Sequence, residues 1–108
     1  MKGFKLDTGK PEYHHIPPEA LEAVAEVFAF GARKYSDYNY RQGMDHSRIF
    51  NALMRHMWAY WRGEDTDTDS QKSHLAHAGC CILMLLQYKI ENVGRDNRYL
   101  TDNKNKIK

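Results

Sequence analysis

The sequence predicts an all-α protein with three main helices and an extended N-terminal arm, in a helix bundle that is completed by oligomerisation. In three separate stretches, apolar residues recur at the 3.6-residue period of a helix, and no stretch shows the alternation of a half-buried strand. The length of 108 residues allows one domain with one core. We place that domain at residues 1–94 and a polar, basic tail at 95–108.

The arm covers residues 1–16, where no helical period appears and where the order Asp-Thr-Gly-Lys-Pro predicts a turn at 7–11. A helix is expected over about 18–35, because it begins with a proline, which suits a first helical turn, and with glutamates that favour the positive end of the helix dipole. Its core-facing stripe is expected to consist of Leu21, Val24, Ala25 and Phe28.

A loop is expected over residues 36–45, which are rich in turn-forming residues. The second helix is then expected to run to about residue 62, with Asp45 or Ser47 as its N-terminal cap. Gly63 is expected to end it.

The third helix is expected to begin at Asp69 or Ser70, after an acidic loop, and to end near Val93 with Gly94 as its terminator. Its segment 78–86 is apolar on all sides, and such a helix segment is normally buried on all sides. Because three helices cannot enclose it, we expect its remaining face to contact another subunit of a homo-oligomer, a dimer or a tetramer.

Composition excludes several classes of protein. Hydrophobic residues at 42% and charged residues at 28% are typical of a globular chain. The tail holds five of the sixteen basic residues and two of the fourteen acids, so residues 1–94 carry eleven bases against twelve acids and offer no basic surface for duplex nucleic acid. No apolar run reaches the ~18 residues that cross a bilayer, and the two cysteines are adjacent, so we expect a cytoplasmic protein without membrane contact.

Three carboxylates, Glu19, Glu22 and Glu26, are spaced by three and four residues and therefore share one stripe of the first helix. Like charges at this spacing repel each other, and a hard divalent cation such as Mg²⁺ would offset the repulsion. A hydrated outer face is the simpler interpretation, and the spacing alone favours it.

The acidic loop leads into His74 and His77, which share a face of the third helix with Cys81 one turn further on. Imidazole and thiolate are zinc ligands, so these three side chains form a candidate soft-metal set. Structural zinc sites usually take two ligand pairs from separate segments, and no second pair is present. Helix capping by the acids and core packing of the histidines is the alternative.

Two further features, a histidine on the second helix and a belt of basic and aromatic residues, each allow a functional and a structural interpretation. His56 lies on the apolar stripe of the second helix, where an inward histidine is more often a packed core residue than a catalyst. A belt of basic and aromatic residues spans 33–41, and such side chains suit phosphate oxygens and base faces. Cations at the end of a helix also stabilise its dipole without any ligand.

Several sequence blocks, taken in order, carry a resemblance to a known family: Asp7-Thr8-Gly9-Lys10-Pro11, Ile16–Leu21, Phe30–Tyr35, Arg55-His56 with Trp58 and Trp61, Gly63-Glu64-Asp65 with Asp67, and His74–Ala78. Over about residues 5–90 the chain resembles the dATP/dGTP diphosphohydrolase family of bacteriophages, which is related to the MazG-like all-α nucleoside triphosphate pyrophosphohydrolases. A phage-encoded protein of this kind would act in the host cytoplasm.

The resemblance implies cleavage of a purine deoxynucleoside triphosphate between its α- and β-phosphates, with Mg²⁺ or Mn²⁺ as the cofactor. MazG-like enzymes hold the ion with an E-x-x-E pair on one helix and an E-x-x-D pair on a later one. Glu19 and Glu22 match the first pair, and Glu26 lies one turn on. The second pair is absent, so we expect it to be replaced by Glu64, Asp65, Asp67 and His77.

The residues expected to act in catalysis are Glu22, which would take a proton from the attacking water, and Lys34, which with Arg33 and Lys10 would neutralise the leaving pyrophosphate. The hypothesis requires acidic side chains from separate turns to converge on an ion beside the bound polyphosphate. The residues expected to bind substrate are Lys10, Arg33, Lys34, Tyr35, Asn39, Arg55, His56 and His74.

Two alternatives remain at this point. An HD-type phosphohydrolase would also use histidines and aspartates on helices, but it needs a His-Asp dipeptide, and the chain has only the reversed pair Asp45-His46. A non-catalytic phage protein of this fold that holds a nucleotide without cleaving it is compatible with the missing carboxylate pair.

Overall fold

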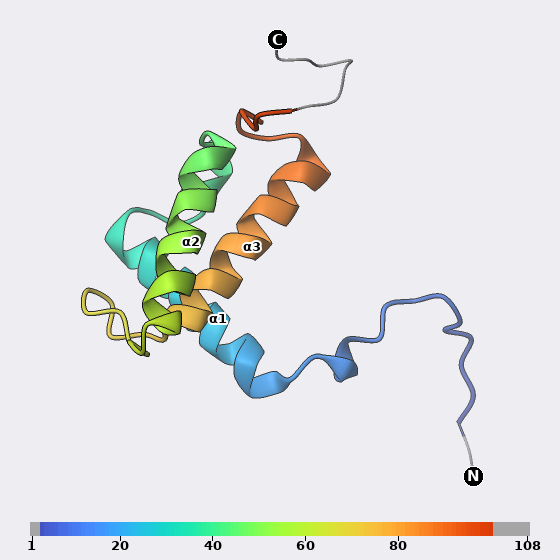
Figure 1. Cartoon of the computed structure of the whole chain (residues 1–108). Helices are drawn as coiled ribbons and strands as arrows, with labels where there is room; N and C mark the ends of the chain where they lie inside the picture. Colours follow the sequence, from blue (N-terminus) through green and yellow to red (C-terminus); the bar gives the residue numbers. More distant parts are fainter. Residues whose placement is uncertain (1–2, 101–108) are drawn as a thin grey trace.

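The computed structural model describes residues 3–100 and confirms the all-α fold, with no strand among these residues beyond two isolated bridges. None of the helices in the described part is both long and apolar enough to span a membrane. Between residues 3 and 100, three α-helices and two short 3-10 helices follow one another (Figure 1): η1 Tyr13–His15, α1 Pro18–Lys34, η2 Asn39–Gln42, α2 His46–Trp61 and α3 His74–Glu91.

Helices α2 and α3 lie side by side, and α1 crosses near the N-terminal end of α3 (Figure 1). The core consists of two clusters, both of which α3 joins. One lies between α1 and α3 and contains Val27, Ala76 and Cys80. The other lies between α2 and α3 and contains Ile49, Cys81 and Tyr88.

Gly79 explains why a glycine occurs inside the apolar part of α3. A Cβ atom at this position would lie 2.9 Å from Cγ2 of Val24, closer than real side-chain contacts allow. The glycine therefore permits the close approach of α1 to α3, although it costs some helix propensity.

The predicted core stripe of α1 is partly wrong. Val24 and Phe28 do pack against the core, but the buried residue of the helix is Val27, whereas Leu21 is 49% exposed and Ala25 is exposed as well. The reason is that α1 contacts α3 through residues 23–28 in its middle, so the face of the helix that is buried is set by the crossing.

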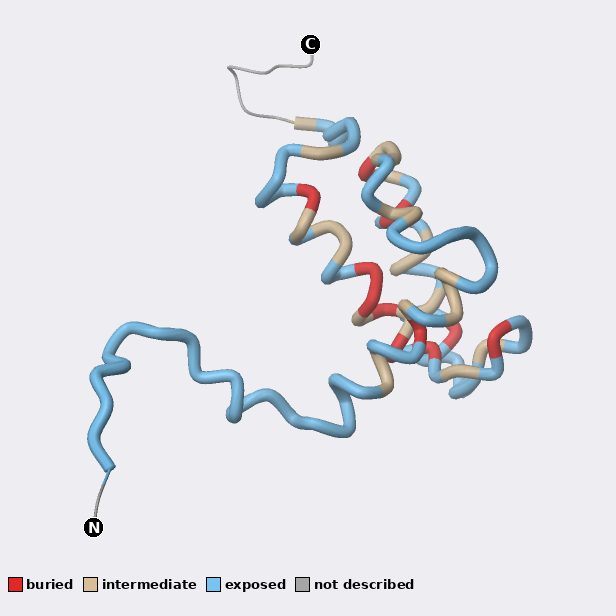
Figure 2. Tube along the Cα trace, turned by 180° about the vertical axis from the view of Figure 1, so that it is seen from behind, coloured by how far each residue is buried: buried red, intermediate tan, exposed pale blue. Residues whose placement is uncertain are grey.

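The N-terminal arm extends away from the helices, and all its described residues are exposed (Figure 2). The predicted turn is present, with the amide of Lys10 donating to the carbonyl of Asp7 at 3.1 Å. The single turn of η1 that precedes α1 is not seen in the sequence pattern.

Both predicted ends of the third helix need correction. The helix begins four residues later than expected, where the Ser73 hydroxyl caps it by accepting from the amides of Leu75 and Ala76. Residues 66–73 form a closed loop instead. The helix ends before Val93, because Asn92 adopts the left-handed conformation with φ 58°.

The start of the predicted tail is structured. Arg95 makes two hydrogen bonds to the carboxylate of Asp45, both 3.0 Å long, and its carbonyl accepts from the amide of His46. The Asn97 side chain contacts Ser47. These contacts hold residues 95–97 against the N-terminus of α2, and the predicted tail residues 101–108 lie outside the described part.

The outer face of α3 is apolar and open to solvent (Figure 2). Ile82 is 52% exposed and Leu86 is 54% exposed, while the opposite face of the same segment contributes to both core clusters. Within one chain, the segment 78–86 is therefore covered on one side only. Its burial by a second subunit stays a prediction.

Candidate functional site

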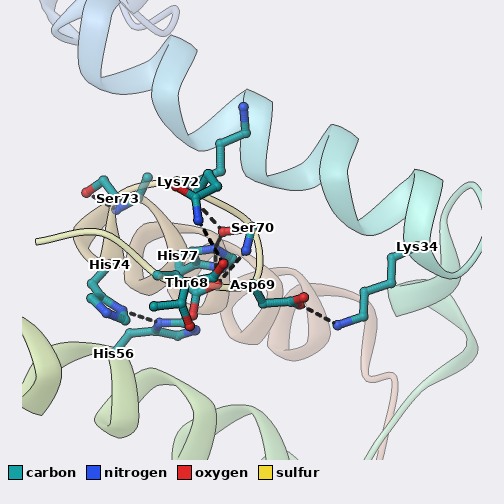
Figure 3. A network of polar contacts seen from close by, with 12 residues as sticks. Lys34, His56, Thr68, Asp69, Ser70, Lys72, Ser73, His74 and His77 are labelled. Atoms are coloured by element: carbon teal, nitrogen blue, oxygen red, sulfur yellow. Dashed lines mark hydrogen bonds and ion pairs between the residues drawn. The ribbon is translucent and has the colours of Figure 1, made fainter.

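The acidic loop between α2 and α3 gathers the polar side chains of the site (Figure 3). The loop folds back on itself through a hydrogen bond from the Asp67 amide to the Lys72 carbonyl, 2.8 Å, and one from the His74 amide to the Asp65 carbonyl, 2.9 Å. Its acids therefore lie over the N-terminal turn of α3, where the helix dipole favours negative charge.

A hydrogen-bonded chain joins the loop to both helices. Nδ1 of His56 on α2 lies 2.9 Å from Nδ1 of His74, and Nε2 of His74 lies 2.9 Å from the Glu64 carboxylate. Since a carboxylate only accepts, His74 donates through Nε2, and in its neutral form Nδ1 is then an acceptor that faces His56. The carboxylate thereby fixes the tautomer and orientation of His74.

A second set of contacts orients Asp67 and His77. The Ser70 amide donates to Asp67 at 2.8 Å, and Nε2 of His77 lies 3.9 Å from the same carboxylate. The buried Ser70 hydroxyl accepts from the Lys72 amide and lies 2.6 Å from Nε2 of His77. Its own proton is thus free to be donated to His77.

Burial and neighbouring imidazoles favour the neutral forms of His56 and His77. Desolvation, with smaller effects from His77 and His74, lowers the pKa of His56 to about 4. Desolvation also lowers the pKa of His77, although the Asp67 carboxylate opposes the shift. The rings of His56 and His77 are stacked with centroids 4.4 Å apart. At neutral pH these rings therefore offer unprotonated nitrogens.

A pocket of about 860 Å³ opens beside this group of histidines and acids. Its volume lies in the range of ligand sites in proteins. Its walls come from the C-terminal half of α1, the segment that follows it, α2, the acidic loop and α3. The polar and aromatic residues that line it are Phe28, Phe30, Lys34, Tyr35, Ser36, Asp37, Tyr38, Asn39, Tyr40, Arg55, His56, Asp67, Asp69 and His77.

Two cations face the pocket. The Lys34 ammonium donates to the Asp69 carboxylate at 2.8 Å, and this contact raises the pKa of Lys34. Both partners are largely exposed, so the pair is screened and contributes little to stability. Arg55 on α2 is the second cation that lines the pocket, and it is exposed. An anionic ligand could therefore contact cations from two helices.

The donors near the pocket suit some divalent ions and not others. His56, Asp67 and His74 each offer a ligand atom, and these atoms lie within 4.8 Å of one another. Mg²⁺ prefers a shell of oxygen atoms, whereas imidazoles favour transition ions. Two imidazoles and a carboxylate therefore fit a transition ion better than they fit Mg²⁺.

The structure brings most of the predicted site residues together. Seven of them line the pocket, namely Lys34, Tyr35, Asn39, Arg55, His56, Asp67 and His77. Two more, His74 and Glu64, adjoin it through the hydrogen-bonded chain.

Other predicted residues lie elsewhere. Glu19 and Glu22 are exposed and belong neither to the pocket wall nor to a metal-capable group within residues 3–100. Glu26 is exposed and lies 3.8 Å from the Lys72 ammonium. Only Glu26 of the three therefore contacts the loop, through Lys72, and the expected convergence of the glutamates on a metal-binding group is not seen among residues 3–100. Three other predicted site residues are exposed and lie outside the pocket wall, namely Lys10, Arg33 and Asp65. Asp65 contributes only its backbone carbonyl, which accepts from the His74 amide.

The soft-metal set of His74, His77 and Cys81 does not form a metal-capable group among the described residues. Cys81 is buried and packs with Ile49 and Tyr88, and desolvation raises the pKa of its thiol, which disfavours a thiolate ligand. His74 pairs instead with His56, which comes from another helix.

Sequence reasoning assigned no site role to Asp69 or Ser70, which it used only as candidate helix caps. Asp69 faces the pocket and pairs with Lys34, and Ser70 is a buried link between the loop and His77. The one available signal was the density of acids in the loop, which does not distinguish a capping acid from a pocket acid.

Replacing Ser70 with alanine should loosen the loop. The change leaves the Lys72 amide and Nε2 of His77 without their partner, and a buried polar group that loses its hydrogen bond costs about 1–3 kcal/mol. Urea unfolding should show a loss of this size for Ser70→Ala. The control Thr68→Ala, in the same loop but exposed, should change the free energy of unfolding by no more than about 0.5 kcal/mol. Equal effects of the two variants would contradict the role of Ser70.

Comparison with known proteins identifies the family. Residues 1–98 match the family model described as dATP/dGTP diphosphohydrolase, N-terminal. A protein of Salmonella phage PMBT28, named dATP/dGTP diphosphohydrolase, is 34% identical over 85 residues, which cover 79% of this chain and 29% of that protein. The chain thus spans less than a third of this relative. No solved structure matches the chain. As the resemblance of its sequence blocks had indicated, the chain belongs to the dATP/dGTP diphosphohydrolase family.

Proposed function

We propose that the chain is a metal-dependent hydrolase that cleaves purine deoxynucleoside triphosphates, dATP and dGTP, to the monophosphate and pyrophosphate. The observation that carries the proposal is that one pocket combines cations, tyrosines and a histidine–carboxylate group. The name of the phage relative supports the same substrate class. Because the chain matches only part of that relative, the activity of the whole relative is carried over here as a proposal.

The cations account for binding of the polyphosphate. A triphosphate carries about four negative charges, and guanidinium and ammonium groups form strong, charge-assisted hydrogen bonds with phosphate oxygens. Arg55 and Lys34 line different walls of the pocket, so both can contact one extended chain of phosphates. Phosphate would compete with Asp69 for Lys34, and the exposure of that pair makes the exchange inexpensive.

The tyrosines account for binding of the base. Tyr35, Tyr38 and Tyr40 line the pocket, and aromatic rings stack on the faces of purines. Asn39 lies among them and offers both a donor and an acceptor for the edge of a base. A base on this segment would leave the phosphates free to reach α2 and the acidic loop.

The divalent ion would be held by the histidines and acids beside the pocket. When bound there, it supplies the usual Lewis-acid chemistry, in which the α-phosphate is polarised and the attacking water becomes more acidic. The chain's own residues orient the substrate against this position, with Lys34 and Arg55 on the phosphates. Of Mg²⁺ and Mn²⁺, the imidazole donors favour Mn²⁺.

Two alternatives have specific support. Binding without cleavage is favoured by the match to the N-terminal part of the family and by the exposed positions of Glu19 and Glu22. An HD-type release of the whole triphosphate is favoured by the histidine–aspartate donor set, although the only Asp-His dipeptide, Asp45-His46, lies at the far end of α2.

Product analysis distinguishes these functions. The protein is incubated with each dNTP and NTP in the presence of Mn²⁺ or Mg²⁺ and then denatured, and the nucleotides are separated. We expect dAMP or dGMP together with pyrophosphate, because the proposal places the cleaved bond between the α- and β-phosphates. Intact nucleotide released from a tight complex would establish binding alone, and inorganic triphosphate would establish the HD-type reaction; either result contradicts the proposal.

Single substitutions assign the roles within the same assay. Lys34→Ala should lower kcat/KM by about tenfold or more through the loss of one phosphate contact. Arg33→Ala is the matched control, because the neighbouring cation does not line the pocket. Glu22→Gln tests the predicted general base, and unchanged turnover by this variant removes Glu22 from the mechanism.

We also propose that the chain forms a homo-oligomer through the outer face of α3. Ile82, Leu86 and Ile90 are each more than half exposed there. A large apolar surface of this kind is unusual in a monomer. A second copy is the expected partner, because a self-complementary apolar face is what a two-fold interface requires.

Sedimentation tests the oligomer. At micromolar concentration we expect a species of twice the chain mass or more, and Ile82→Lys should shift it toward the monomer, because a buried charge is costly. Gln87→Lys adds the same charge to α3 at a position that is not apolar and serves as the control. A wild-type chain that sediments as a monomer would contradict this assembly.

A further inference from the structure

We infer that His56, His74 and Asp67 form a binding site for one first-row transition-metal ion, and that Mg²⁺ is not its natural occupant. The inference rests on the proposed function only for the use of the ion. The site itself is argued from the described contacts. The donors come from α2, from the first residue of α3 and from the loop between them, so folding alone brings them together.

The contacts behind the donors are those of a metal site. A histidine that binds a metal usually donates its other ring nitrogen to a carboxylate, which fixes its tautomer. His74 does so, with Nε2 2.9 Å from Glu64 and Nδ1 directed at His56. Asp67 is likewise held in place, because it accepts from the Ser70 amide at 2.8 Å. Two of the three donors are therefore oriented by groups that do not bind the ion themselves.

The spacing of the two imidazoles suits a shared ion. Two nitrogens bound to one ion at about 2.1 Å lie about 3.0 Å apart at the right angle of octahedral coordination and about 3.4 Å apart at the tetrahedral angle. The Nδ1 atoms of His56 and His74 are 2.9 Å apart, with a proton between them in the metal-free protein. Binding of the ion takes the place of that hydrogen bond, and His56 then carries its proton on Nε2.

The surroundings indicate an ion that is open to a ligand. His56 and Asp67 line the pocket, whereas His74 is buried behind them. Three protein donors leave coordination positions vacant toward the pocket, as in catalytic rather than structural metal sites. Two imidazoles and one carboxylate with open positions are a donor set of transition ions, and Mg²⁺ would have to exchange two of its preferred oxygen ligands for nitrogens here.

Cobalt absorption tests the site without any nucleotide. The full-length protein is titrated with Co²⁺, and visible d–d bands are followed. Every sample carries His14→Gln and His15→Gln, because an exposed group of Glu12, His14 and His15 also brings its ligand atoms within 4.8 Å and could bind cobalt. We expect one ion per chain. Zn²⁺ should displace it, and a hundredfold excess of Mg²⁺ over Co²⁺ should not.

Variants locate the ion. His56→Gln and Asp67→Asn should abolish the saturable bands, since each removes a ligand at a half-buried position that tolerates replacement. Glu64→Gln removes only the partner of His74 and should weaken cobalt binding by about 10–100-fold while the bands remain. Asp65→Asn, on the neighbouring exposed acid, is the matched control and should bind cobalt as the parent does. Circular dichroism establishes that each variant is folded.

The outcomes separate this site from the proposed reaction. Absence of saturable bands in the folded parent, displacement by Mg²⁺, or unchanged cobalt binding by His56→Gln and Asp67→Asn would each overturn the inference. Cobalt binding at one site in a protein that cleaves no nucleotide would leave the site standing and remove the hydrolase proposal. Cleavage of dNTPs by a protein without a cobalt site would support the hydrolase proposal and overturn the metal site.

Discussion

The contact between His56 and His74 is the constraint on which the site depends. It joins the middle of α2 to the first residue of α3, and the acidic loop between the two helices is held over it by Glu64. Separation of the two imidazoles would break the hydrogen bond between α2 and α3 and remove His56 from the group that it forms with His74 and Asp67. The pocket wall would open at the same place, because His56 and His77 line it and their rings stack.

The contact between His56 and His74 explains why polar side chains lie at the loop end of α3, next to its apolar segment. Beyond its first turn α3 is mainly apolar, and the core clusters with α1 and α2 hold it in place. The two histidines of α3 lie in its first turn, where the loop enters, and the segment 78–86 that follows is apolar. The apolar packing therefore sets the distance between the helices, and the histidine contact uses that distance. The apolar packing can thus hold the metal-binding side chains in position even where the polar contacts between them are weak.

Much of the fold could be predicted from the sequence, because the apolar period is a local signal. The three helices appear where the period indicated them, and α1 starts at Pro18 as the proline suggested. The start of α3 was not predicted, since Asp69, Ser70 and Ser73 are all competent caps and only the closure of the loop selects Ser73. Cap preference alone does not identify which of several polar residues is the N-terminal cap.

The site was predicted in its composition and missed in its arrangement. His74, His77 and the loop acids were recognised by their spacing, and Lys34 and Arg55 by the resemblance to the family. The pairing of His56 with His74 could not be predicted, because it joins residues 18 positions apart on two helices. Glu19 and Glu22 matched a known motif, yet neither belongs to the residues of α1 that pack against α3, so both remain exposed.

The most direct measurement of the central claim is a crystal structure of the protein grown with Mn²⁺ and a non-hydrolysable dATP analogue, with anomalous diffraction recorded to locate the ion. The account predicts an anomalous peak bonded to His56, His74 and Asp67, with phosphate oxygens of the analogue completing its coordination from the pocket. A peak on Glu19 and Glu22, with the two histidines still hydrogen-bonded to each other, would contradict it.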